Sequence, residues 1–578
     1  MQQKFWVHCF VKNSITKANK SNSLQVILNI LLNRQFSVNL LIMPENYFSE
    51  TSLIRLNLQP FQMKKYILVF WFLLLATAFS FGQKAKRTNK DFAVKGFHLD
   101  LRIQVMTMDA LKAFAQKLHQ YNINTLVMEW EATYPFQKHV LIPNRYAYTR
   151  EEITSFVKYC KDLNIDVIPL QQSFGHVEYI LRNNKYQDLR EDQKDYSQVC
   201  PLETDLNKAL FTDLFSDLAV THPSKYFHIG GDETYLLGHC EKCQKKAATE
   251  GKSKLYIDHI RMLCDIVIKQ GKQPVLWADI ALKYPEAIKL LPKETIFVDW
   301  NYGWDLNRFG DLNKLLETGY EIWGAPSLRS GPDNYFLTLW ENHFNNIRDF
   351  IPTARKLGYK GMVMTSWSTS GLYSTVFENT ADIIDLYAMW HRYPLTGYNM
   401  LLAAYAEGLK SDKPLQVKSF IEKYAKDTYG FNKAEARTFW KALSAAPYNI
   451  RKGKVQGENP IPIPVILDST ILAAKALNAL KPTKNKEEFE HYKLMTDIRV
   501  QYLAYQNLES QVNSDTYTAA QTPAILPRLQ EIITQSAALN KRFIALNKNY
   551  YYTTELQEEN RFRNVKAQLL YDRLAKVR

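Results

Sequence analysis

The chain has 578 residues, a formal net charge of +15 and a hydrophobic content of 46%. This length exceeds what one ordinary hydrophobic core accommodates, so two or more domains are expected. Lysines and arginines are interspersed with acidic residues along the chain, which argues against a nucleic-acid partner and favours an ordinary solvated surface.

An apolar segment near the N-terminus has the order of a secretory signal peptide. Residues 63–65 read Met-Lys-Lys, an uncharged apolar run follows at 66–79, and small residues precede Gln83. The run is shorter than the ~20 residues of a membrane-spanning helix. We therefore expect residues 63–82 to be a signal peptide, and the mature protein to be periplasmic or secreted without stable membrane insertion. Residues 1–62 would come from an upstream start; a genuine extension with a signal anchor is the alternative.

Eight short apolar segments rich in β-branched and aromatic residues follow, and segments with helical spacing, such as 108–121 and 150–163, lie between most of them. Strands that alternate with helices predict a parallel sheet. Eight strands over residues 83–390 predict an α/β protein with a (β/α)8 TIM barrel, whose active site lies at the carboxyl ends of the strands. The expected strands are 96–102, 124–131, 166–172, 226–233, 274–279, 296–302, 320–326 and 361–367.

From residue 395 to residue 578 the pattern changes to long segments with apolar residues spaced by three and four. This spacing is typical of amphipathic helices. We expect an α-helical C-terminal domain without a catalytic cluster, which packs against the barrel or forms a dimer. The sequence leaves the oligomeric state open.

The fourth expected strand ends in "HIGGDE", where two glycines precede two acids. Consecutive strand residues point to opposite faces, but Gly230 and Gly231 tolerate dihedrals that let the chain leave strand geometry. Asp232 and Glu233 can then both face the barrel mouth. Paired carboxylates of this kind suit glycoside hydrolysis. The alternative is an acidic pair that caps the next helix.

Residues 228–233 resemble the H-x-G-G-D-E signature of glycoside hydrolase family 20, the β-N-acetylhexosaminidases. The resemblance runs from about 96 to 370 and is nearest to the hexosaminidase D branch at "MEWEATYPF" and "VIPLQQSFGHVEYIL". It implies exo action on N-acetylhexosamine-containing glycans, without a cofactor, by a substrate-assisted retaining mechanism. Asp232 would orient the sugar's 2-acetamido group and stabilise the oxazolinium, and Glu233 would be the general acid and base.

The resemblance also implies an aromatic pocket around the acetamido methyl group. Trp277, Trp300 and Trp367 stand at the ends of the fifth, sixth and eighth expected strands, in places that look like the family's tryptophan wall. Tyr302 is a candidate donor to the acetamido oxygen.

Polar candidates complete the expected substrate site. His176, in "FGHVE", matches a family histidine in the loop after the third strand. Glu129 and Glu131 have the same strand parity and would face the same way, so both are candidates for binding sugar hydroxyls. Asp279, two residues after a strand-end tryptophan, is a similar candidate.

Two positions depart from the family pattern. The wider family has an arginine three residues after the first-strand aspartate, whereas Arg102 is two residues after Asp100 and has the other parity. Thr369 stands where the family often has glutamate. Because both departures remove expected hydroxyl contacts, N-acetylglucosamine and N-acetylgalactosamine both remain possible, with the hexosaminidase D likeness tilting towards the latter.

Two other classes of function stay open. One is a conventional retaining glycosidase whose nucleophile is a separate carboxylate, such as Glu131 or Asp299. The other is a non-catalytic glycan-binding barrel, which the intact Asp-Glu pair argues against.

The cysteines are too few for a disulfide scaffold in a chain of this length. Cys240 and Cys243 form a C-x-x-C motif beside His239, but two or three ligands fall short of the four of a zinc site. A local disulfide or free thiols are therefore expected and no metal ligands are assigned, although the sequence leaves open whether Cys240 and Cys243 are disulfide-bonded, metal-bound or free. The cysteines after the signal segment are Cys160, Cys200, Cys240, Cys243 and Cys264.

Overall fold

The computed structural model describes residues 91–330, 339–368, 393–445, 450–451, 454–455 and 461–576. The expected upstream extension (1–62), the expected signal peptide (63–82) and Thr369 lie outside these ranges. Within them, no helix combines the length and the apolar character needed to span a membrane.

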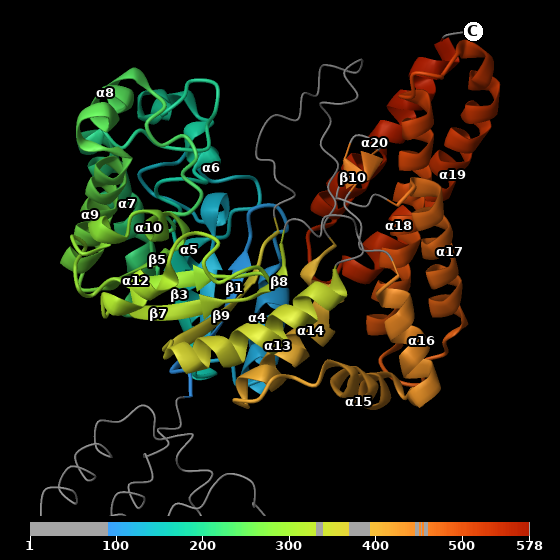
Figure 1. Cartoon of the computed structure of the whole chain (residues 1–578), viewed down its shortest axis with the longest axis horizontal. Helices are drawn as coiled ribbons and strands as arrows, with labels where there is room; N and C mark the ends of the chain where they lie inside the picture. The colour runs from blue at the N-terminus through green and yellow to red at the C-terminus, as the bar shows by residue number, and fades with distance from the viewer. Residues whose placement is uncertain are drawn as a thin grey trace, which may run out of the picture. The chain divides into compact units, whose positions relative to one another are not determined.

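Parallel strands close into a barrel (Figure 1). Each of the six strands β1 to β6 pairs with the next along the chain, β7 pairs with β9, and the pairing of β1 with β9 closes the ring. The short β8 lies parallel to β9. The expected TIM-barrel architecture is thus confirmed. The strands are β1 Val94–Asp100, β2 Thr125–Glu129, β3 Asp166–Leu170, β4 Tyr226–His228, β5 Gln273–Trp277, β6 Ile296–Trp300, β7 Glu321–Ala325, β8 Ser327–Arg329 and β9 Gly361–Ser366.

Alternate strand residues fill the barrel interior, as the two-residue period of a strand requires. Val127, Val275, Trp277 and Trp323 belong to this inner cluster, while the residues between them pack outwards against helices. Gly361 makes room for an indole ring, since a Cβ atom there would lie 2.6 Å from Trp323. The inner face is therefore closed by packed side chains below the carboxyl ends of the strands.

Helices cover the outside of the barrel. The expected helices over 108–121 and 150–163 are confirmed to within a residue, and the second begins at a capping box between Thr149 and Glu152. The helices of this part are α4 Met108–Gln120, η1 Glu131–Thr133, α5 Arg150–Asp162, α6 Glu178–Leu181, η2 Asn184–Leu189, α7 Thr204–Thr221, α8 Glu241–Glu250, α9 Lys252–Lys269, α10 Asp279–Lys283, α11 Pro285–Ile288, α12 Leu312–Glu317 and α13 Trp340–Leu357.

The C-terminal part is helical, as expected. Figure 1 shows the long helices α17 to α20, in orange and red, side by side. A two-stranded pair, β10 Ile450–Arg451 and β11 Lys454–Val455, precedes them. The helices are η4 Leu395–Tyr398, α14 Asn399–Leu409, α15 Val417–Tyr429, α16 Lys433–Leu443, α17 Ile463–Ala479, α18 Lys486–Val512, η5 Ala519–Gln521, α19 Thr522–Asn547 and α20 Thr553–Lys576.

The C-terminal helices hold the loop that follows β1. The carboxylate of Glu555 accepts a 2.7 Å hydrogen bond from the backbone N–H of Val105. On the same helix, Glu559 accepts a 3.0 Å hydrogen bond from the side chain of Gln104. Both carboxyl groups are buried, so α20 fixes the backbone at the carboxyl end of the first barrel strand.

Candidate active site

The two glycines after β4 turn the chain out of strand geometry. Gly230 and Gly231 have φ angles of 71° and 92°, and Glu233 has a φ of 48°. A Cβ atom on Gly230 would lie 2.0 Å from the side-chain oxygen of Gln172, so only glycine fits there. As a result, the side chains of Asp232 and Glu233 reach the same neighbour instead of opposite faces of a strand.

That shared neighbour is His176. Its Nε2 lies 3.4 Å from Oδ2 of Asp232 and 3.3 Å from Oε2 of Glu233. Burial lowers the pKa of His176, but the negative charge and hydrogen bond of Asp232 outweigh burial and raise the pKa well above its usual value. The imidazole is therefore a cation between two carboxylates. Asp232 keeps its other oxygen, Oδ1, buried and without a hydrogen-bond partner among the described residues.

Glu233 is partly open to solvent and held by a second donor. The Tyr235 hydroxyl donates a 2.7 Å hydrogen bond to Oε1 of Glu233, whose side chain is 33% exposed. Burial raises the pKa of Glu233, but the hydrogen bond and charge of His176, the bond from Tyr235 and the charge of Arg102 together bring the pKa below its usual value.

Asp279 lies directly behind the pair. Its Oδ2 accepts a 3.1 Å hydrogen bond from the backbone N–H of Glu233, and its Oδ1 accepts a 3.3 Å bond from the indole N–H of Trp300. Burial and the charge of Asp232 raise the pKa of Asp279 to about 7. The structure thus places Asp279 as a support for the site, with both oxygens already engaged by protein donors.

The four predicted aromatic residues come together beside the carboxylates. The rings of Trp277 and Trp367 lie 5.7 Å apart, and those of Trp300 and Tyr302 lie 5.2 Å apart. The indole N–H of Trp367 donates a 2.6 Å hydrogen bond to the hydroxyl of Tyr302. Two inward tryptophans and one from the sixth strand therefore form a continuous aromatic surface with Tyr302.

Arg102 enters the site despite its parity. Its Nε donates a 2.7 Å bond to Glu131 and its guanidinium a 2.9 Å bond to Oε1 of Glu129. The strand alternation does not apply to Arg102, because β1 ends at Asp100. The carboxylate of Asp100 accepts a 2.7 Å hydrogen bond from the backbone N–H of Arg102. Glu129 is fully buried and also bonds His98 at 2.7 Å. Burial raises the pKa of Glu129, but the Arg102 charge, the contact with His98 and the hydrogen bond from Gln172 together outweigh burial and bring the pKa below its usual value.

Asp299, a possible separate nucleophile, lies elsewhere. It accepts a 2.6 Å hydrogen bond from the hydroxyl of Tyr359, and burial raises its pKa to about 6. Neighbouring residues of β6, Val298 and Trp300, belong to or pack against the barrel interior, so Asp299 points to the outside of the barrel by strand parity.

Three residues of the site were not predicted from the sequence. Tyr235 stands two residues after Glu233, and His98 shares strand parity with Asp100. The spacing of these two residues along the sequence could therefore have identified both as candidates for the site. Arg102 carried no such signal, because the strand-based parity argument pointed the other way.

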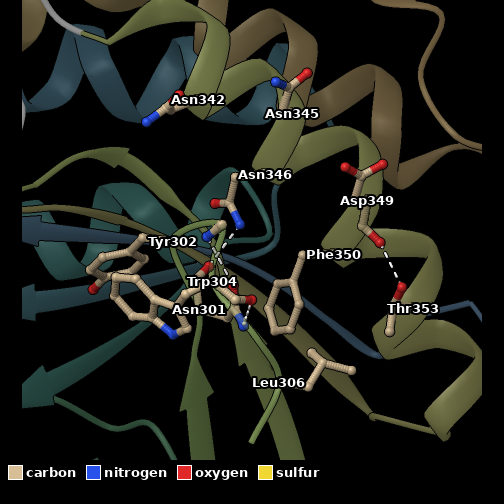
Figure 2. Close-up of a pocket in the computed structure, with 11 residues that line it drawn as sticks. Asn301, Tyr302, Trp304, Leu306, Asn342, Asn345, Asn346, Asp349, Phe350 and Thr353 are labelled. Atoms are coloured by element: carbon tan, nitrogen blue, oxygen red, sulfur yellow. Dashed lines mark hydrogen bonds between the residues drawn. The ribbon is translucent and has the colours of Figure 1, made fainter. Parts of the chain in front are cut away.

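A separate pocket of about 340 Å³ lies beside the aromatic surface, between the loop after β6 and helix α13 (Figure 2). Figure 2 shows Asn342, Asn345 and Asp349 on the helix, across from the loop residues. Neither carboxylate of the 232–233 pair lines this pocket. It is lined by Asn301, Tyr302, Gly303, Trp304, Leu306, Asn342, Asn345, Asn346, Asp349, Phe350 and Thr353.

One group of side chains in the described residues has the composition of a metal site. Glu191, Cys200, Cys240 and Cys243 each offer one ligand atom, and these atoms lie within 4.8 Å of one another. Glu191 and Cys200 come from the segment between β3 and α7, Cys240 caps helix α8, and Cys243 lies in its first turn.

The chain is similar to known glycoside hydrolases. Residues 96–371 match the family model of the glycosyl hydrolase family 20 catalytic domain. The chain is 26% identical to Hexosaminidase D of Bos taurus over 298 residues, 49% of this chain and 86% of that protein. It is 27% identical to Hexosaminidase D of Homo sapiens over 305 residues, 50% of this chain and 62% of that protein. A solved β-N-acetylhexosaminidase from Bacteroides fragilis has a TM-score of 0.44 and 18% identity, over 58% of this chain and 70% of that one. Residues 96–371, which include the carboxylate pair that follows β4, are therefore a glycosyl hydrolase family 20 catalytic domain, and the chain is a hexosaminidase-type glycoside hydrolase similar to Hexosaminidase D.

Proposed function

We propose that the protein is an exo-acting β-N-acetylhexosaminidase that removes terminal β-linked N-acetylglucosamine or N-acetylgalactosamine by a substrate-assisted retaining mechanism. The observation that carries this proposal is the adjacent pair Asp232 and Glu233 bridged by His176. Other carboxylates near the mouth are engaged by protein donors: Glu129 and Glu131 bond Arg102. Because these described carboxylates are not available as a nucleophile opposite the acid, the sugar's own acetamido oxygen takes that role.

In the first step the acetamido oxygen attacks the anomeric carbon while the glycosidic bond breaks. Asp232 accepts the acetamido N–H at its unpartnered Oδ1 and stabilises the positive oxazolinium. Glu233 donates its proton to the leaving oxygen. In the second step water attacks the same carbon from the vacated side, Glu233 takes the water's proton, and the acetamido group is restored with overall retention.

The proton needed for the first step is held within the bridged trio. In the free site the pKa of Glu233 is lowered and the pKa of His176 is raised. His176, whose Nε2 lies 3.3 Å from Oε2 of Glu233, therefore favours the ionised form of the acid in the free site. Substrate that displaces this contact raises the pKa of Glu233, so that Glu233 holds the proton that it donates.

The aromatic surface selects the acetamido group. Trp277, Trp300 and Trp367 offer an apolar wall for its methyl, and the Tyr302 hydroxyl, which already accepts the indole N–H of Trp367, can donate to its carbonyl oxygen. A sugar that carries a hydroxyl in place of the 2-acetamido group cannot make these contacts with the aromatic surface.

The experiment that tests the proposal compares aryl β-glycosides of N-acetylglucosamine and N-acetylgalactosamine with plain glucosides and galactosides. Hydrolysis of the acetamido sugars alone, and inhibition by a thiazoline mimic of the oxazoline, are the expected results. Turnover of plain glycosides without thiazoline inhibition would indicate a separate carboxylate nucleophile. Binding without turnover of any substrate would indicate a glycan-binding barrel.

We also propose that the enzyme acts outside the cytoplasm. The support is the basic, apolar and small-residue order of residues 63–82. N-terminal sequencing of protein recovered from the periplasm and medium should give a chain that begins near Gln83. A mature chain that begins before residue 60 contradicts this.

A further inference from the structure

The C-x-x-C motif does not stand alone in the folded chain. Cys200, forty residues upstream, places its Sγ 3.7 Å from that of Cys240 and 3.6 Å from that of Cys243. The carboxylate Oε2 of Glu191 lies 3.3 Å from the Sγ of Cys243. Three thiols and one carboxylate therefore converge on one point, which the sequence could not show because its ligand count stopped at the motif.

These separations fit a tetrahedral metal ion. Zinc–thiolate bonds of about 2.3 Å place two sulfurs of a tetrahedron about 3.8 Å apart. The separations of 3.6 and 3.7 Å are close to this value, whereas a disulfide requires about 2.05 Å. All three thiols are free. A disulfide between any two would leave the third thiol and the carboxylate facing it.

Glu191 is held as a ligand and not as a surface acid. It is 2% exposed. Its Oε1 accepts backbone N–H groups of His239 at 2.7 Å and Cys240 at 2.9 Å, which leaves Oε2 directed at the thiols. Such outer contacts are what orients metal ligands in proteins. The His239 ring, 53% exposed, turns instead to Asp192 at 3.2 Å.

We propose that Glu191, Cys200, Cys240 and Cys243 form a closed structural zinc site. Four protein ligands leave no open position, which is the arrangement of a structural and not a catalytic site. The soft thiolates select zinc over magnesium or calcium. On binding, the three thiols become thiolates and release their protons to solvent.

The site joins two segments that carry the active site. Residues 171–203, the β3–α7 segment, hold His176, and residues 229–240, the β4–α8 segment, hold Glu233. Apart from the ligands, the backbone N–H of Leu236 bonds Gln198 at 3.0 Å, and that of Val177 bonds Ser197 at 3.2 Å. A metal that ties Cys200 to Cys240 therefore adds a link between the segment that holds His176 and the segment that holds Glu233.

The test uses the full chain, purified without a histidine tag. Its zinc content is measured by inductively coupled plasma mass spectrometry. We expect about one zinc per chain. Cys200→Ser and Cys243→Ser should lose most of it. Cys160→Ser and Cys264→Ser, two buried cysteines outside the group, should keep it and serve as matched controls. Removal of zinc by a chelator should lower the melting temperature, and added zinc should restore it.

Cobalt gives a readout that does not need a variant to fold. Chelated wild-type protein reloaded with cobalt under reducing conditions should show thiolate-to-cobalt charge-transfer absorption and the visible bands of tetrahedral cobalt. Wild-type protein that binds neither metal, or a disulfide between two of the three cysteines in freshly purified protein, would overturn the proposal. Variants that retain zinc as the controls do would overturn it as well. Zinc content and melting temperature do not depend on the substrate, so this test stands apart from that of the proposed function.

Discussion

The carboxylate of Asp279 accepts a 3.1 Å hydrogen bond from the backbone N–H of Glu233. The bond holds a residue whose φ is 48°, a conformation that non-glycine residues adopt only when their surroundings enforce it. Asp279 is therefore a positioning residue for the acid, through the backbone and not through the substrate.

Replacing Asp279 with alanine removes the acceptor for Glu233 and for the Trp300 indole. Loss of a buried hydrogen-bond partner costs about 1–3 kcal/mol, so kcat/KM should fall about 10- to 100-fold. Asp299→Ala is the matched control, since Asp299 is similarly buried and bonds the hydroxyl of Tyr359 outside the site. Both variants should lower the melting temperature, but only the first should lower kcat/KM. Equal kcat/KM losses would mean that Asp279 stabilises the fold alone.

Glu233→Gln should slow substrates in proportion to how poor their leaving group is. General acid–base help contributes ~10²–10⁴ in rate, and an aryl glycoside with a very acidic phenol needs little of it. Pre-steady-state measurement of the glycosylation step with a good and a poor leaving group checks this. The same loss for both leaving groups would remove Glu233 from the acid role.

Asp232→Asn should lose ~10²–10³ in rate, because stabilisation of a developing charge is of this size. This loss should be independent of leaving-group acidity, which separates Asp232 from Glu233. The thiazoline mimic should also bind the variant much more weakly, since its charged form resembles the intermediate. If the wild-type protein and Asp232→Asn have the same inhibition constant at one pH, the substrate-assisted mechanism is wrong.

His176→Ala should move the alkaline limb of the kcat/KM profile to higher pH. The acid works only when protonated, so activity falls as pH rises through the free-enzyme pKa of Glu233. His176 lowers that pKa by hydrogen bond and charge, and Tyr235 lowers it by a hydrogen bond. Removing either partner therefore raises the pKa.

Tyr235→Phe is the graded comparison for this titration, and its shift should have the same direction and a smaller size. Both profiles are measured with one good-leaving-group substrate, so that a lower maximum does not obscure the position of the limb. A limb that stays in place or moves to lower pH in His176→Ala would show that His176 does not set the protonation of Glu233.

Glu559 should make the folded chain less stable as pH rises. Burial raises its pKa from 4.5 to about 7, so between these values the folded state binds more protons than the unfolded state. The contribution of Glu559 to the free energy of unfolding is therefore greatest below about pH 4.5. This contribution declines by about 3 kcal/mol as pH rises through about 7.

Glu559→Gln should flatten this decline, because glutamine keeps an acceptor for Gln104 without a titrating charge. Glu558→Gln, at the partly exposed neighbouring residue that pairs with Arg145, is the control and should change the slope far less, because its charge makes a smaller contribution to the pKa of Glu559 than burial does. Urea unfolding at several pH values measures both. A wild-type slope that Glu559→Gln does not alter would contradict the buried-acid account.

The barrel could be predicted from the sequence because its strands and helices are local patterns. All eight expected strands form, but several expected ranges ran past the true ends: the first was expected to reach Arg102 and stops at Asp100, and the fourth was expected to reach Glu233 and stops at residue 228. Functional residues leave strand geometry at the barrel mouth, and a two-residue period says nothing about where that happens.

The candidate site was predictable where its chemistry is contiguous and not where it depends on contacts between distant segments. The twin glycines pointed to the 232–233 pair. The distant contact between Cys200 and the C-x-x-C motif had no local signal. The contacts of Glu129 with His98 and Arg102 had no local signal either. Strand parity predicts the direction in which a carboxylate points, but it does not predict which side chains from other strands bond it.

Six described non-glycine residues have a left-handed backbone, and three of them are Asn122, Asn164 and Asn485. The other three are Glu131, His176 and Glu233, all in the site, and each such conformation costs on the order of 1–3 kcal/mol. A directed-evolution screen for heat tolerance alone should therefore enrich glycine or asparagine at these three positions, gaining stability as it deletes the active site. Thermostable descendants of this enzyme will have to be selected for turnover and heat tolerance together.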